Sequence, residues 1–262
     1  MRDIFDEIQV KLDEIEQREN VRILLAVESG SRAWGLSSPD SDYDVRFVYQ
    51  RVRKDYLRLD EKKDTIDWQL DEVLDINGWD LKKALRQFYK GNATLFEWSN
   101  SPVVYRKRPE WDEIYREAKV YFSKKAAVHH YRGTAANTFY GHLQTDRVKY
   151  KKYFYALRPL LACRYIEENH CPPPVLFDEL MKLKLPEGLC TQVEELLRIK
   201  KTTKEGQLNP QLPLVIDFIA SELERQKEIA DLMEDDHLKD WDVLNRIFMD
   251  RVLGLQSLCM EE

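Results

Sequence analysis

The chain has 262 residues, of which 43% are hydrophobic and 34% charged, so it is long enough to bury one large core or two small ones. Its formal net charge of −6 excludes a basic coat that grips nucleic acid over the whole surface, and any contact with RNA must use a local patch. No run of 18 apolar residues is present, so we expect no membrane-spanning helix and no membrane partner.

The cysteines and the first twenty residues bear on the cellular compartment of the protein. The first twenty residues are charged throughout, unlike a secretory signal. The cysteines form no Cys-x-x-Cys pair and are too sparse for a disulfide scaffold. We therefore expect a cytoplasmic protein, and no pattern in the sequence fixes its oligomeric state.

The first part of the chain predicts a helix and two strands. Apolar side chains recur at helical spacing through residues 3–19, which predicts an amphipathic helix. An apolar run rich in β-formers predicts a buried strand at 23–27, and a second strand is predicted at 43–49. A small-residue turn and a polar loop connect these strands.

The next stretch predicts further strands and a capped helix. Residues 51–63 form a charged connection without clear periodicity, and 65–79 alternate in part, which predicts one or two strands. Helical spacing follows over 81–88. Asp80 is placed to cap the beginning of this helix and Gly91 to end it.

From Glu110 onward helical periodicity dominates. Helices are predicted within 139–161, 176–201, 214–234 and 238–258. Pro159 is expected to kink or split the first of them, and three consecutive prolines at 172–174 to break the chain after it.

Asp42 and Asp44 carry the strongest chemical signal. They are two residues apart at the start of the second predicted strand, so their side chains share one face. Neighbouring carboxylates repel unless a cation lies between them, and Mg²⁺ takes carboxylate oxygens together with substrate phosphates. Gly30 lets a backbone approach a phosphate, and Ser31 adds a hydroxyl. This layout suits phosphoryl or nucleotidyl transfer, although an acidic pair at a strand start is also common in a solvated turn.

Two arginines near these acids have alternative roles. Arg32 directly follows Ser31, and it either contacts a triphosphate or faces solvent. Arg46 has the side-chain parity of Asp42 and Asp44, so we expect it to pair with them or to contact a phosphate.

A basic stretch lies between residues 146 and 158. Arg147, Lys151 and Arg158 are spaced by four and seven, which predicts one face of a helix. Such a face can hold a triphosphate or an RNA backbone, and the interleaved tyrosines can stack on a base. The alternative is a solvated face whose aromatic residues belong to the core.

The Gly-Ser turn, the loop and Ser-Asp-Tyr-Asp-Val at 41–45 resemble the signature of the DNA polymerase beta-like nucleotidyltransferase superfamily. Residues 74–98 are similar to a branch of predicted nucleotidyltransferases that includes a DNA polymerase beta-like protein of an RNA-repair pathway. The resemblance implies an α+β fold, with a small mixed β-sheet nucleotidyltransferase core and flanking helices in 1–109. An all-helical C-terminal domain follows in 110–262, with the active site in the cleft between the two domains.

The resemblance also implies a third carboxylate on the strand after the Asp-x-Asp strand. The candidates are Asp67, Asp71 and Asp75. We prefer Asp75, because related chains carry an acid at that place before a helix of the form L-x-K-x-L. Asp67 is the alternative, because it lies in the better strand.

Other residues are implied to bind the nucleotide. Related chains carry a similar lysine-to-arginine run on a helix after the catalytic domain. This run corresponds here to Lys151, Lys152 and Arg158. With Gly30, Ser31 and Arg32, these residues form the implied nucleotide-binding set.

The implied activity is transfer of a nucleoside monophosphate from a nucleoside triphosphate such as ATP to an acceptor hydroxyl. Mg²⁺ or Mn²⁺ would be held by Asp42, Asp44 and Asp75. The acceptor suggested by the resemblance is an RNA 3′ end, such as a damaged transfer RNA. Protein AMPylation, as in toxin–antitoxin relatives, and a small-molecule acceptor stay open, and a non-catalytic helical binding module is the alternative from another class.

Overall fold

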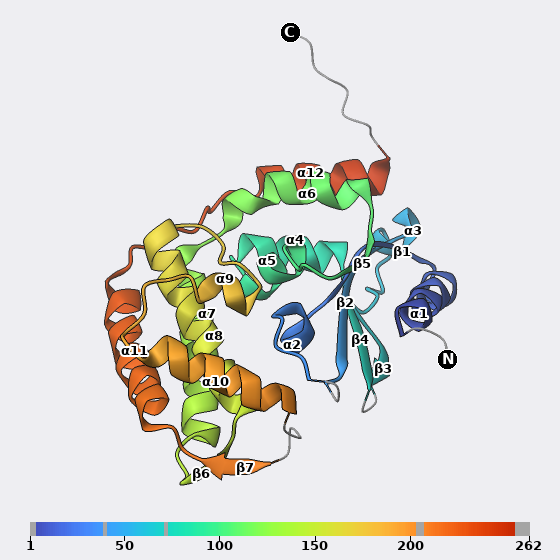
Figure 1. Ribbon diagram of the computed structural model, residues 1–262. Coiled ribbons are helices and arrows are strands. Elements are labelled where there is room, and N and C mark those ends of the chain that lie inside the picture. Colours follow the sequence, from blue (N-terminus) through green and yellow to red (C-terminus); the bar gives the residue numbers. More distant parts are fainter. Residues whose placement is uncertain (1–3, 39–40, 71–72, 203–206, 255–262) are drawn as a thin grey trace. The chain divides into compact units, whose positions relative to one another are not determined.

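The computed structural model describes residues 4–38, 41–70, 73–202 and 207–254. A mixed five-stranded sheet and a mainly helical remainder confirm the predicted α+β class (Figure 1). None of the helices in these ranges is long and apolar enough to cross a membrane.

The chain forms two compact units that interleave along the sequence. The sheet unit takes the described residues of 1–29, 42–121 and 237–262, and the helical unit takes those of 30–41 and 122–236. This grouping differs from a single boundary after residue 109, because the last helix joins the sheet unit and the Gly-Ser loop joins the helical unit. The division into folding domains of 1–109 and 110–262 stays a prediction.

Five strands form the sheet in the order β3-β4-β2-β1-β5. They are β1 (Val21–Glu28), β2 (Tyr43–Arg51), β3 (Thr65–Leu70), β4 (Leu74–Asp80) and β5 (Val104–Lys107). β2 and β4 run parallel, and the other neighbouring pairs are antiparallel. Two parallel strands therefore begin at the same edge of the sheet, which decides where the candidate site forms.

Helices cover both faces of this sheet (Figure 1). α1 (Ile4–Glu19) packs its buried Ile8, Leu12 and Ile15 against β1 and β5. α4 (Leu81–Tyr89) and α5 (Ala93–Ser99) cover the other face. Because both faces are covered, β1 is a nearly continuous apolar run rather than an alternating one.

The local signals around α4 are confirmed. The Asp80 side chain accepts a hydrogen bond from the Lys82 amide at 2.7 Å, which caps the helix. Gly91 follows the helix with a φ of +62°, a left-handed conformation that favours glycine. The described part of the sheet unit also contains α3 (Arg53–Tyr56), α6 (Pro109–Ala118), the short 3-10 helix η1 (Lys119–Tyr121) and α12 (Asp242–Leu253).

The helical unit is built on three packed helices, α7 (Lys124–His142), α8 (Lys151–Asn169) and α11 (Pro213–Leu232). It also contains α2 (Gly30–Ala33), α9 (Phe177–Leu180) and α10 (Leu189–Thr202). A two-stranded ribbon pairs β6 (Arg147–Lys149) with β7 (Leu208–Pro210). Pro159 lies inside α8 without splitting it, and the helical segment is interrupted instead by the ribbon before Lys151.

Candidate functional site

Two carboxylates lie side by side where the parallel strands begin. Asp44 is the second residue of β2 and Asp75 the second residue of β4, and the register makes them direct neighbours. Val45 and Ile76 belong to the core under α1, so the alternation of a strand places both carboxylates on the opposite face. Asp42 comes directly before Tyr43, the first residue of β2, and is exposed.

The charges of these groups are coupled through Arg46. Burial raises the pKa of Asp44 above its ordinary value; the Arg46 guanidinium opposes this shift, and the charges of Asp42 and Asp75 add to it. Arg46 Nη2 lies 2.6 Å from Asp75 Oδ2 and 3.2 Å from Asp44 Oδ1, and its Nη1 donates to the Asp75 carbonyl at 3.1 Å. Of the two roles expected for Arg46, the structure shows the ion pair.

A divalent cation fits the donors of this site by their chemistry. Within the described ranges, no three carboxylate, imidazole or thiol groups are gathered as a metal site, and the Arg46 guanidinium contacts the two strand carboxylates. The donors are the hard oxygens that Mg²⁺ and Mn²⁺ prefer. Burial raises the pKa of Asp44, so a bound cation would favour its ionised form.

The alternatives to Asp75 lie elsewhere. Asp67 of β3 pairs with Asn77, one strand farther from β2 than Asp75. Its exposed carboxylate accepts a hydrogen bond from the Asn77 side chain. Asp71 lies outside the described residues. The geometry favours Asp75 as the neighbour of Asp44, and its role as a ligand stays a prediction.

Glu28 fixes the backbone of Asp44, a role that the sequence analysis did not assign. Glu28 ends β1 and is only 1% exposed. Its Oε1 accepts a hydrogen bond from the Asp44 amide at 2.7 Å, and its Oε2 accepts one from the Tyr105 hydroxyl. The Ser29 amide donates to the Asp44 carbonyl at 2.8 Å. The sequence signal for this role was a charged residue at the end of a buried apolar strand. The partners of Glu28 are far away in the sequence, so its contacts could not be predicted.

The Gly-Ser turn forms the short helix α2 of the helical unit. Gly30 has a φ of +60°, which favours glycine, and its carbonyl accepts a hydrogen bond from the Trp34 amide at 3.1 Å. Arg32 Nη2 donates to the Ser41 carbonyl at 2.6 Å, so this guanidinium connects the two ends of the loop. Phosphate binding by Gly30, Ser31 and Arg32 stays a prediction.

The predicted basic helix face includes one error. Arg147 lies in β6 and pairs with Pro210 of β7, and α8 begins only at Lys151. The prediction that Arg147 shares a helical face with Lys151 and Arg158 is therefore wrong. The physical reason is the pairing of the ribbon, which a spacing rule cannot show.

Lys151 and Lys152 are partly exposed in the first turn of α8. The Lys152 Nζ lies 5.6 Å from the centre of the Tyr155 ring. Burial lowers the pKa of Lys152, and the charges of Lys151 and Lys149 lower it further. The role of the two lysines in binding a nucleotide stays a prediction.

Arg158 is engaged inside the helical unit. It is 1% exposed, its guanidinium carbon lies 4.6 Å from the centre of the Trp34 ring, and its Nε donates to the Val175 carbonyl at 3.2 Å. These contacts give Arg158 a structural role in packing Trp34 against α8. Its assignment to the nucleotide stays a prediction.

The chain matches a known protein family over nearly its whole length. The model of the RNA repair pathway DNA polymerase beta family, RlaP, matches residues 4–250. The chain belongs to this family. Membership of RlaP confirms the resemblance and makes the chain a DNA polymerase beta-like nucleotidyltransferase by family.

One curated relative is similar to this chain over almost its whole length. The chain is 39% identical over 244 residues to the uncharacterized protein YcgL of Bacillus subtilis (strain 168), which covers 92% of this chain and 94% of the relative. The solved structure of a nucleotidyltransferase-like protein from Exiguobacterium sibiricum 255-15 also matches, at 10% identity and a TM-score of 0.31. The match covers 97% of this chain and 81% of that protein's chain. This structural likeness is too distant to add to the argument.

Proposed function

We propose that the protein is a metal-dependent enzyme that transfers a nucleoside monophosphate from a nucleoside triphosphate to an acceptor hydroxyl. The observation that carries the proposal is the pair Asp44 and Asp75, direct neighbours on two parallel strands and bridged by a cationic side chain. Family membership supports the same class of reaction.

In this proposal Asp42, Asp44 and Asp75 hold Mg²⁺ or Mn²⁺. The bound ion supplies neutralising charge for the triphosphate and lowers the pKa of the acceptor hydroxyl. Glu28 keeps the Asp44 backbone in place through the hydrogen bond to its amide. Arg46 exchanges its carboxylate contacts for a phosphate oxygen when the acids are neutralised.

The chemistry is a single in-line displacement. The acceptor hydroxyl gives its proton to a water molecule, its oxygen forms a bond to the α-phosphorus, and the bond from that phosphorus to the pyrophosphate oxygen breaks. Gly30, Ser31, Lys151 and Lys152 are proposed to hold the pyrophosphate that leaves. No covalent enzyme intermediate is required.

The proposed acceptor is an RNA 3′ end. The description of the family as one of an RNA repair pathway supports this choice. AMP transfer to a protein and the non-catalytic binding module are the outcomes that would replace it.

The test is a transfer assay with the whole chain. The protein is incubated with Mg²⁺ or Mn²⁺, each labelled nucleoside triphosphate, total RNA and a cell lysate. Label on RNA that is absent with Asp42→Asn supports the proposal, and label on protein supports AMPylation. If no label is transferred and calorimetry detects no metal-dependent binding of any nucleotide, the enzyme proposal is rejected.

A further inference from the structure

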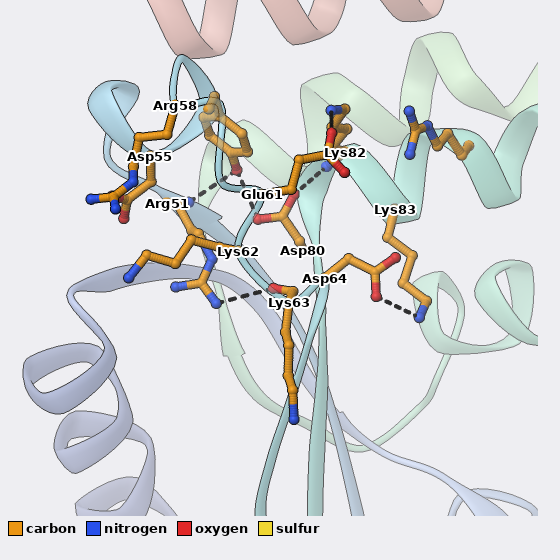
Figure 2. Close-up of a pocket in the computed structure, with 12 residues that line it drawn as sticks. Arg51, Asp55, Arg58, Glu61, Lys62, Lys63, Asp64, Asp80, Lys82 and Lys83 are labelled. Carbon is orange, nitrogen blue, oxygen red and sulfur yellow. Dashed lines mark hydrogen bonds and ion pairs between the residues drawn. The ribbon is translucent and has the colours of Figure 1, made fainter.

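A basic cavity lies in the sheet unit, at the ends of the strands that begin with the acids. Seven of the twelve residues that line it are Lys or Arg and four are Asp or Glu, in a chain with a net charge of −6. Its volume is about 120 Å³. Figure 2 shows its wall, with Arg51 from the end of β2, Lys62 and Lys63 from the connection that follows, and Lys82 and Lys83 from α4. The local excess of positive charge suits an anion.

Part of this charge has no carboxylate partner. Three of the seven cations form ion pairs: Arg58 with Asp60, Lys82 with Glu61, and Lys83 with Asp64. Lys62, Lys63 and Arg86 are exposed and form no ion pair with a carboxylate of the described chain.

Arg51 is the buried member of the cavity wall. It is 7% exposed and donates through Nη2 to the Lys63 carbonyl at 3.2 Å. Its Nε is buried and has no hydrogen-bond partner among the described residues. A buried guanidinium with an unused donor is costly unless a ligand or water satisfies it. The Arg51 guanidinium therefore adds a buried positive charge to the wall of the cavity.

The cavity is separate from the acidic site. β2 runs from Asp44 to Arg51, seven residues at roughly 3.3 Å each, which places the two sites roughly 23 Å apart. β4 runs the same way, from Asp75 near its start to Asp80, which lines the cavity. A nucleoside triphosphate bound at the acids therefore does not reach the basic cavity.

A second cavity adjoins the first along α4. It has a volume of about 430 Å³, and Lys82 and Arg86 line both. Trp241 and Phe248 form part of its wall. Trp241 is 39% exposed, and its ring stacks on Tyr89 with 3.6 Å between the ring centres and 11° between the planes. A fixed aromatic surface next to cations suits a base that is linked to a phosphate.

We propose that these two cavities form a docking site for a single-stranded polynucleotide, with a backbone phosphate in the basic cavity and a neighbouring base against Trp241. The inference deepens the proposed function and rests on it only in identifying the docked strand as the acceptor. A polynucleotide can occupy this site and the acids at the same time, which a mononucleotide cannot do across roughly 23 Å. An acidic peptide or inorganic phosphate would satisfy the cations but leave the aromatic wall unused.

The test is a direct binding measurement with the full chain. Binding of a short fluorescent single-stranded RNA is followed by anisotropy over a range of salt concentrations, without nucleoside triphosphate or divalent metal. Lys62→Ala, Lys63→Ala and Arg86→Ala combined should weaken binding roughly tenfold or more and reduce the slope of log affinity against log salt by roughly two. All three side chains are exposed, so the fold is preserved.

A control removes two cations from α1, which packs on the face of the sheet opposite α4. Lys11→Ala with Arg18→Ala should leave both affinity and salt slope nearly unchanged. An equal loss of affinity in this control would mean that only net charge matters, and the proposal would be overturned. Tighter binding of inorganic phosphate, a mononucleotide or anionic lipid vesicles than of RNA, with the same sensitivity to the triple variant, would also overturn it.

A second variant tests the base-binding wall. Trp241→Leu should weaken RNA binding several-fold but should not change binding of an oligonucleotide of the same length without bases. Equal effects on both ligands would remove Trp241 from the site. Asp44→Asn should keep full RNA binding although transfer is lost, so failure of the docking site and failure of the proposed reaction are separate results.

Discussion

At the scale of single residues, Asp44 combines a catalytic prediction with a stability prediction. Asp44→Asn should abolish nucleotidyl transfer, because one oxygen ligand loses its charge. It should not lower the melting temperature, because burial and two neighbouring carboxylates already raise the pKa of Asp44. Activity and thermal unfolding of the same preparation check this. A large drop in melting temperature would show that the carboxylate is structural.

The buried carboxyl of Asp80 should make the stability of the protein fall between about pH 4 and pH 6. Burial raises the pKa of Asp80 to about 6, while hydrogen bonds from the Lys82 amide and the Tyr56 hydroxyl and the charge of Arg51 lower it. Between the unfolded value of 3.8 and about 6, the folded state keeps a proton that the unfolded state has released. The contribution of Asp80 to stability therefore falls as pH rises through this window and stays low above it.

The measurement is urea unfolding of the unaltered chain and Asp80→Asn at pH 4 and pH 7. From pH 4 to pH 7, the free energy of unfolding of the unaltered chain should fall by up to about 3 kcal/mol more than that of the variant. The asparagine keeps the helix cap, so α4 remains intact in the control. Parallel pH profiles of the two proteins would show that Asp80 titrates normally.

At the scale of elements, Gly78 of β4 leaves room for the Phe47 ring of the parallel strand β2. It lies opposite Phe47 in the pairing of β2 with β4, and a Cβ at Gly78 would overlap the Phe47 ring. Gly78→Ala should therefore cost about 1–3 kcal/mol of unfolding free energy through overpacking. It should also reduce transfer, because the same register places Asp75 beside Asp44.

Phe47→Leu provides the test for this account, because it makes room for the added methyl group. The double variant should be less destabilised than the sum of the two single variants, measured by denaturant unfolding. Strict additivity would mean that the ring and the glycine do not limit each other.

Most elements followed from local patterns, and the misses have a common cause. The helix over 4–19, the two strands that flank the Gly-Ser loop and the caps of α4 were visible in periodicity and capping residues. β5 and β6 were missed, because a strand of three or four residues is too short for a pattern. Their conformation is decided by pairing with β1 and β7, which are far away in the sequence.

At the scale of the whole molecule, the sequence carries a prediction for the acids but none for their surroundings. Spacing predicts Asp42 and Asp44 as ligands, and the family resemblance implies Asp75. The bond from Glu28 to the Asp44 amide and the contacts of Arg46 depend on pairing between strands. The basic cavity was hidden because residues 51–63 and 82–86 contribute to it from separate segments of an acidic chain.

The most direct test of the central claim is calorimetry of a non-hydrolysable nucleoside triphosphate in the presence and absence of Mn²⁺. The unaltered chain and Asp67→Asn should bind the nucleotide in a Mn²⁺-dependent manner, whereas Asp44→Asn and Asp75→Asn should lose this dependence. Loss with Asp67→Asn and retention with Asp75→Asn would move the third ligand to β3. Binding that ignores Mn²⁺ in all four proteins would contradict the account.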